Sequence, residues 1–208
     1  MARTLPMFPL GSVLFPYATL PLHVFEPRYR ALTEHCLAGD GRFGVVLIER
    51  GSEVGGGDTR FSVGTVAEIV RAGRLPDGRY VLAARGTQRL RVTDWLPDDP
   101  YPRADVELLD DEGAGEGAED LRVSAVQRLT QVVDLLARLG ESAPAAELAL
   151  EFADDPARAS YELAALAPIG PLDAQRLVEM DEPTARLAEI DRLLGEHVEI
   201  LELRLAGS

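Results

Sequence analysis

The stretch "RAGRLPDGRYVLAARGTQRLRV" (residues 71–92) predicts a β-hairpin. Strand-forming apolar residues lie on both sides of "LPDG" (75–78), which has the composition of a tight turn. The proline presets φ for the turn, and the glycine is free to adopt positive φ. Together with "FSVGTVAEIV" (61–70), the stretch predicts two long paired strands, at 61–75 and 79–92.

Arginine is frequent in this hairpin, at positions 71, 74, 79, 85, 89 and 91. Such a series can grip phosphate, hold an acidic ligand, or only solvate one face of a sheet. Exposed arginine without a ligand is the usual case. We therefore expect most of these side chains to solvate the sheet or contact the acidic second half, and a minority to touch ligand.

Outward from the hairpin, the first 110 residues are rich in short strand segments, at 4–10, 19–25, 42–50 and 101–110. One helix is expected at 27–37, because Pro27 suits an early helical position and Gly39 a stop. This order predicts a small closed or partly closed barrel. The phenylalanines expected inside it are Phe8, Phe15, Phe25, Phe43 and Phe61, whereas Tyr29, Tyr80 and Tyr101 are expected to be half-exposed.

Beyond residue 110 the hydrophobic period changes to that of helices. Residues 111–120 ("DEGAGEGAED") have the composition of a linker, and helices are expected at 121–140, at 143–153, and from Pro156, Pro171 and Pro183. The sequence thus predicts an α+β chain with a barrel lobe at 1–110, a linker at 111–120 and a helical bundle lobe at 121–208.

Charge and composition limit the classes of function that the chain can have. The net charge is −14, and residues 1–108 hold 13 Arg against 13 Asp and Glu, so the whole excess lies in the second half. Such an acidic chain repels nucleic acid and anionic membranes at long range. A single cysteine permits no internal disulfide, and no uncharged apolar run has the length of a membrane helix. We expect a cytoplasmic protein that binds neither membrane nor nucleic acid.

The chain contains no lysine, so all 21 basic residues are arginine. This excludes a Walker A site, a Ser-Lys dyad and lysine Schiff-base chemistry, including that of pyridoxal phosphate. The three histidines and Cys36 match no metal-ligand spacing, and no serine lies in a G-x-S-x-G context. We therefore expect no cofactor, no metal and no catalytic residues.

The chain resembles the N-terminal, substrate-binding domain of Lon proteases. The resemblance is carried by "LPMFPLGSVLFP" (5–16), "LPLHVFEPRYRAL" (20–32), "FGVVLI" (43–48), the block at 63–92 and, more weakly, residues 165–194. It implies a PUA-like β-barrel followed by a helical lobe, and recognition of unfolded or damaged protein segments. Because 208 residues leave no room for the ATPase and peptidase domains, we expect a stand-alone, non-catalytic form.

The leading hypothesis is a module that holds an extended, partly apolar polypeptide through a strand edge and apolar pockets. Any downstream partner is expected to be a protease or a chaperone. A PUA-like RNA-binding module and a small-molecule enzyme that uses scattered carboxylates stay open as alternatives. The family often has a small residue where Tyr17 stands, which affects any groove beside that corner. The candidate peptide-binding residues are Pro16, Tyr17, Tyr29, Arg71, Tyr80 and Arg85.

Overall fold

The predicted hairpin is present in the computed structural model, which describes residues 3–51, 59–141 and 151–207. β4 (Thr59–Arg74) and β5 (Tyr80–Leu96) pair in antiparallel register on either side of the turn. The Gly78 N–H donates to the Leu75 carbonyl at 2.9 Å, and Gly78 has a φ of 84°. The Pro-Asp-Gly sequence thus serves the turn as predicted, because glycine adopts positive φ without a steric cost.

The chain divides into two units, Met1–Asp110 and Asp111–Ser208. The first contains six strands and one helix: β1 (Arg3–Leu10), β2 (Thr19–Val24), α1 (Pro27–Ala38), β3 (Arg42–Arg50), β4, β5 and β6 (Arg103–Leu109). The second contains four helices: α2 (Ala118–Arg138), α3 (Pro156–Leu166), α4 (Pro171–Glu179) and α5 (Pro183–Ala206). Strands followed by helices give the predicted α+β class.

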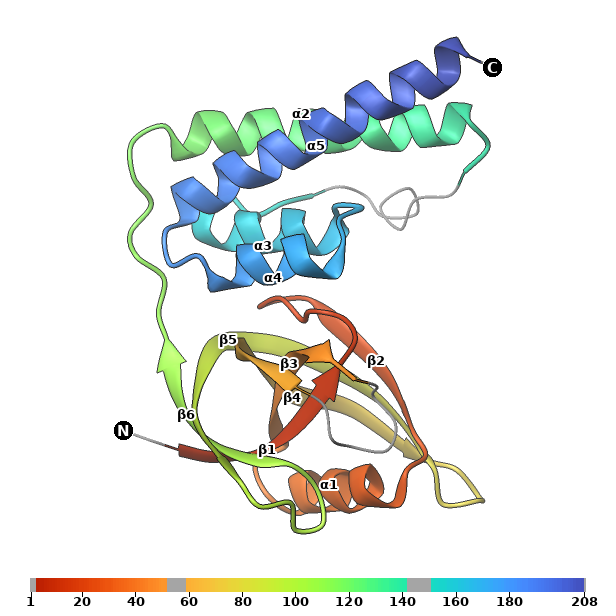
Figure 1. Cartoon of the computed structure of the whole chain (residues 1–208), viewed down its shortest axis with the longest axis vertical. Helices are drawn as coiled ribbons and strands as arrows, with labels where there is room; N and C mark the ends of the chain where they lie inside the picture. Colours follow the sequence, from red (N-terminus) through yellow and green to blue (C-terminus); the bar gives the residue numbers. More distant parts are fainter. Residues whose placement is uncertain (1–2, 52–58, 142–150, 208) are drawn as a thin grey trace. The chain divides into compact units, whose positions relative to one another are not determined.

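Five strands of the first unit close into a barrel. The strand order is β2-β5-β4-β3-β1-β6, and β6 also pairs with β5, which completes the ring. β3 is buried on both faces through its centre, as its continuous apolar run predicts. β2 stands outside the ring and pairs antiparallel with the first part of β5, while α1 lies against one end of the barrel (Figure 1).

Two apolar clusters fill this unit. The larger one contains Tyr29, Leu32 and Cys36 of α1 together with side chains from the first part of β5. The smaller one lies among β1, β3, β4, β5 and β6. Phe25 was expected inside the barrel but is 54% exposed, because it follows the last residue of β2 and precedes α1.

The second unit is built on two long helices that run in the same direction. Ser124 of α2 donates to Asp191 of α5 at 2.7 Å. Gln131 donates to Glu202, about two turns further along α2 and about three turns further along α5. α2 begins three residues before the expected position, after Gly117, which has a φ of 80°. Glu119 and Asp120 in its first turn suit the positive end of the helix dipole.

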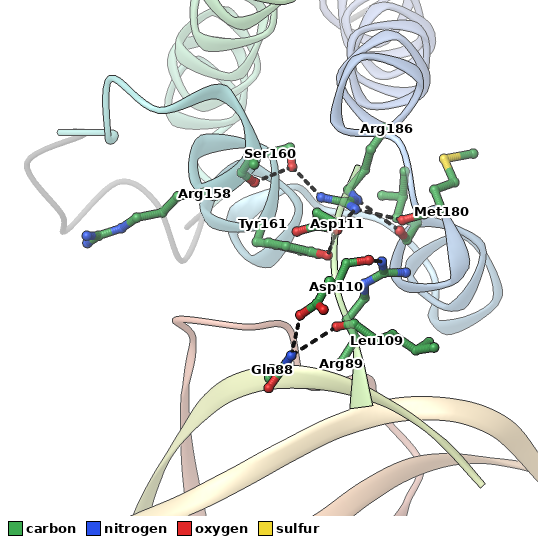
Figure 2. A network of polar contacts seen from close by, with 12 residues as sticks. Gln88, Arg89, Leu109, Asp110, Asp111, Arg158, Ser160, Tyr161, Met180 and Arg186 are labelled. Atoms are coloured by element: carbon green, nitrogen blue, oxygen red, sulfur yellow. Dashed lines mark hydrogen bonds and ion pairs between the residues drawn. The ribbon is translucent and has the colours of Figure 1, made fainter. Parts of the chain in front are cut away.

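Arg186 of α5 is fully buried in this unit and organises a polar network (Figure 2). Its guanidinium donates to Asp111 Oδ1 at 2.6 Å, to Ser160 Oγ at 2.8 Å and to the carbonyls of Leu177 and Met180 at 3.3 and 2.6 Å. The same group stacks on the ring of Tyr161 at 3.8 Å, and the Tyr161 hydroxyl donates to Asp111. A buried charge of this kind needs such partners, because desolvation is costly.

The residues that were expected to form a linker make hydrogen bonds within the second unit. The Glu112 N–H donates to the Asp181 carbonyl at 2.9 Å, and the Gly115 N–H donates to Thr184 Oγ1 at 2.8 Å. The helix expected at 143–153 lies almost wholly outside the described residues. Within the described part of the chain, no helix combines the length and the apolar character that crossing a membrane requires.

Candidate functional site

The six candidate residues separate into an exposed and a buried group. Tyr17, Arg71 and Arg85 are exposed on the barrel unit. The buried group comprises Pro16, Tyr29 and Tyr80.

The expectation that Tyr29, Tyr80 and Tyr101 are half-exposed is wrong, because they are 4%, 7% and 6% exposed. Tyr29 stacks on Phe8 with ring centroids 4.1 Å apart. Tyr80 packs in the larger apolar cluster, and its hydroxyl donates to Glu34 at 3.1 Å. A tyrosine that has a partner for its hydroxyl is readily buried, and the sequence did not reveal those partners.

A pocket of about 370 Å³ brings two of the exposed candidates together. Arg71 does not line it, although it follows the lining residue Val70 in sequence. We call this the Tyr17 pocket. Its lining residues are Tyr17, Glu68, Val70, Arg85, Gly86 and Thr87.

The corner that carries Tyr17 is fastened to β5 by backbone hydrogen bonds. The Tyr17 N–H donates to the Gly86 carbonyl at 2.8 Å, and the Gly86 N–H donates to the Ala18 carbonyl at 2.9 Å. A Cβ at Gly86 would overlap the carbonyl oxygen of Phe15 and lie 3.0 Å from its carbonyl carbon. Glycine is therefore required for this close approach of two backbones.

Tyr17 itself has a φ of 67°, a left-handed conformation that is uncommon for residues other than glycine. The two hydrogen bonds at Gly86 hold it there. Tyr17 is 39% exposed, so the pocket is lined by an aromatic residue that solvent can reach. Backbone strain of this kind is concentrated at binding and catalytic sites.

Two β-bulges supply further lining residues. The register of β4 and β5 passes from Val66↔Gln88 to Ala67↔Gly86, which leaves Thr87 as the extra residue on β5. It then passes from Ile69↔Ala84 to Arg71↔Ala83, which leaves Val70 as the extra residue on β4. Both extra residues line the Tyr17 pocket. Bulges redirect side chains in this way and are frequent beside functional sites.

The charges of the pocket are not equally compensated. Glu68 lies opposite Arg42 on β3 and opposite Arg85 on β5. Its carboxylate pairs with the Arg42 guanidinium at 3.6 Å. Arg85 is exposed and forms no ion pair with any residue in the described ranges. The pocket therefore presents a guanidinium that is in no ion pair with a described residue.

A second, smaller pocket of about 180 Å³ lies along β2. β2 pairs with β5 alone among the described strands, so its other edge is open to pairing. Pro21 on this strand is consistent with an edge position, because proline lacks the N–H that an inner strand donates. Tyr29 lies among the lining residues of this pocket, the others being Phe8, Leu10, Pro21, Leu22, His23, Val24, Phe25 and Glu26.

Other chemistry finds little support among the described residues. No group of three or more His, Cys, Asp or Glu side chains in this part of the chain is placed to hold a metal ion. Burial, with a smaller effect of the Asp40 charge, raises the pKa of the Cys36 thiol from 9.0 to about 12. A thiol that stays protonated is a poor nucleophile.

Four lining residues were not among the candidates: Glu68, Val70, Gly86 and Thr87. Val70 and Thr87 become lining residues through a register shift, which no local motif encodes. Gly86 did carry a signal, because a glycine inside a strand pattern indicates a bulge or a close backbone approach.

A barrel closed by the pairing of β5 with β6, followed by a helical unit, defines a two-part α+β protein. The chain belongs to the family of Lon substrate-binding domains, because residues 4–196 match the family model described as the ATP-dependent protease La (LON) substrate-binding domain. This confirms the resemblance that the sequence blocks indicated.

Full-length relatives agree with this assignment. The chain is 30% identical over 203 residues to Lon protease 2 of Herpetosiphon aurantiacus, which covers 96% of this chain and 24% of that protein. It is 26% identical over 202 residues to the Lon protease of Escherichia coli, which covers 96% of this chain and 25% of that protein. The chain thus spans about a quarter of the length of the curated relatives it matches.

Solved structures agree as well. A Lon N-terminal domain protein from Xanthomonas campestris is 29% identical, with a TM-score of 0.66 over 90% of this chain and 96% of that chain. The N-terminal domain of Lon protease from the Mycobacterium avium complex has the same TM-score at 17% identity, over 94% of this chain and 100% of that chain, and indicates the fold alone.

Proposed function

We propose that the barrel unit binds extended segments of other polypeptides and makes or breaks no bond in them. The Tyr17 pocket carries this proposal, because an aromatic residue with a strained backbone lines a cavity that can take a side chain. Membership of the Lon substrate-binding family supports the same class of ligand. A protease or a chaperone would process the chain that is held.

The open edge of β2 supplies the second element of the mechanism. An extended segment laid against this edge gains backbone hydrogen bonds whatever its sequence, and pockets beside the strand accept alternate side chains. The smaller pocket, which is lined by residues of β2, would accept one such side chain. Backbone pairing with few side-chain contacts suits a receptor that accepts many different chains.

The expected affinity is modest. Burial of two or three apolar side chains contributes on the order of 3–6 kcal/mol before ordering costs are subtracted. Binding in the micromolar range follows, with fast release. Release matters for a protein that holds a chain only until another protein acts on it.

The test compares a reduced, carboxymethylated protein that cannot refold with the same protein in its native form. We expect measurable binding of the unfolded form alone in a fluorescence anisotropy titration. Tyr17→Gly weakens that binding, whereas Leu172→Ala, which removes a 60% exposed side chain from α4, leaves it unchanged. Equal binding of native and unfolded forms overturns the proposal, as does turnover of a peptide or metabolite that a pocket variant abolishes.

A further inference from the structure

The Arg85 guanidinium, which is in no ion pair with a described residue, suggests a preference among the peptides that the Tyr17 pocket binds. We infer that this pocket selects extended segments in which a carboxylate adjoins a large apolar side chain. The inference rests on the proposed function, because it assigns a ligand preference to the same site. It depends on how the charges of Glu68, Arg42 and Arg85 are distributed.

The register of the sheet offers Glu68 two arginine neighbours. Arg42 faces it from β3 and Arg85 from β5. The carboxylate pairs with Arg42 at 3.6 Å, with both side chains about half exposed at 43% and 45%. The one acidic side chain that lines the pocket is thus already engaged away from Arg85.

The other neighbours of Arg85 are neutral. Thr19 faces it from β2, and Gly86 and Thr87 follow it on β5. Because Arg85 lines the pocket together with Tyr17 and Val70, a ligand in the pocket meets apolar surface and a guanidinium at once. Arginine donates several N–H groups in a planar array that matches the two oxygens of a carboxylate.

The ligand carboxylate has two sources, an Asp or Glu side chain and the C-terminus of a chain. Phosphate is the other anion that a guanidinium binds, and RNA would supply it. The acidity of the whole chain disfavours RNA, since 35 Asp and Glu residues face 21 arginines. A peptide carboxylate on an apolar segment uses the guanidinium and the apolar wall together.

The test uses four fluorescein-labelled peptides built on one phenylalanine in a Gly/Ser background. Three are amidated at the C-terminus and carry Glu, Gln or Arg on either side of the phenylalanine, with the residue after the phenylalanine as the last of the peptide. The fourth has the sequence of the Gln peptide and ends in a free carboxylate. We expect the Glu peptide to bind roughly two- to fivefold more tightly than the Gln peptide at low salt, the range of an exposed ion pair. This ratio should fall toward one at 0.5 M NaCl.

Variants locate the effect. Arg85→Gln should equalise the Glu and Gln peptides, and Arg85→Glu should favour the Arg peptide. Arg176→Gln makes the same change of charge on an exposed arginine of α4 and should keep the preference. A preference of the free-carboxylate peptide over its amidated Gln counterpart, lost in Arg85→Gln, supports the inference with the chain terminus as the source.

The failures are distinguishable. Equal binding of all four peptides by the wild type overturns this inference and leaves the proposed function standing. A preference for Glu that survives in Arg85→Gln also overturns it. Absence of binding by every peptide contradicts the proposed function and this inference together. A single-stranded RNA of 12 nucleotides that binds more tightly than the peptides, and loses affinity in Arg85→Gln, assigns the site to phosphate instead.

Discussion

At Tyr17 the chain adopts a conformation that its own side chain disfavours. The left-handed region costs an L-residue about 1–2 kcal/mol relative to its usual regions. The hydrogen bonds to Gly86 enforce that conformation from outside the residue. Glycine would satisfy the same backbone at no steric cost, so the tyrosine side chain is retained at the expense of stability. Such a side chain is expected to serve binding.

Substitution of Tyr17 separates stability from function. Tyr17→Gly should leave the free energy of unfolding unchanged or raise it by up to about 1 kcal/mol, because relief of strain and greater entropy of the unfolded chain oppose each other. Tyr17→Val should lower it by at least about 1 kcal/mol, since a β-branched residue tolerates positive φ poorly. Both variants should bind the unfolded protein more weakly. Urea titrations and anisotropy measure the two effects, and a stable Tyr17→Val protein would contradict the strain argument.

At the scale of elements, the β4–β5 hairpin does more than close the barrel. Its two bulges place Thr87 and Val70 at the pocket, and Gly86 between them admits the corner at Phe15 and Tyr17. A strand without bulges would alternate its side chains strictly and could not gather these residues. The site is thus a property of the irregularities in the hairpin.

A methyl group at Gly86 tests this dependence. Gly86→Ala should lower the free energy of unfolding by about 1–3 kcal/mol, because the added Cβ meets backbone atoms of Phe15 that cannot rotate away. It should also weaken peptide binding by displacing Tyr17. Gly73→Ala is the matched control, since a Cβ there would lie 3.9 Å from the Val81 carbonyl oxygen, an ordinary van der Waals distance. Equal stability of the two variants would refute a close-packed corner.

In the helical unit, α3, α4 and the connection after α4 all accept hydrogen bonds from Arg186 of α5 (Figure 2). Asp111 brings the first residue of this unit into the same network. One side chain thus ties together segments that are far apart in sequence. Because the guanidinium is planar, it reaches several acceptors at once while it stacks on Tyr161.

Loss of this network should strongly destabilise the protein. Arg186→Met should lower the free energy of unfolding by about 3–5 kcal/mol, since it removes the cation that pairs with Asp111 and the donor to buried carbonyls. Arg186→Lys keeps the charge but has too few N–H groups for these acceptors. Its stability should therefore lie between that of the wild type and that of Arg186→Met. Arg176→Gln removes an arginine from an exposed pair with Asp173 and should leave the melting temperature unchanged. Circular dichroism melts rank the variants, and an Arg186→Met protein as stable as Arg176→Gln would show the network to be dispensable.

For the whole molecule, sequence patterns predicted the architecture but only part of the site. Hydrophobic period, helix-opening prolines and the "LPDG" turn are local signals, and each predicted element in the described ranges formed within a few residues of its expected ends. The Tyr17 pocket depends on register shifts and on the contact of Phe15 with Gly86, about 70 positions apart. The burial of Arg89 and Arg186, at 1% and 0% exposed, likewise depends on partners that no local pattern names.

The ionisation of Cys36 should make the stability of the barrel unit depend on pH. Its Sγ–H donates to the Arg42 carbonyl at 3.3 Å, a bond that requires the proton, and burial raises its pKa from 9.0 to about 12. In the unfolded chain the thiol loses its proton near pH 9, whereas the folded protein keeps it. The folded state therefore binds more protons between about pH 9 and 12, and stability falls as pH rises through that window.

A variant without the thiol isolates the contribution of Cys36 to this pH dependence of the free energy of unfolding. At most about 1.4 kcal/mol is lost for each pH unit above 9 from this one group. Other ionisable groups are present in both wild type and Cys36→Ala and largely cancel in the difference. The free energy of unfolding of the wild type, measured in urea from pH 7 to 10.5, should therefore decline more steeply than that of Cys36→Ala above pH 9 and in parallel below it. Parallel curves throughout would mean that Cys36 ionises in the folded barrel as easily as in the unfolded chain, which its burial and its hydrogen bond to Arg42 argue against.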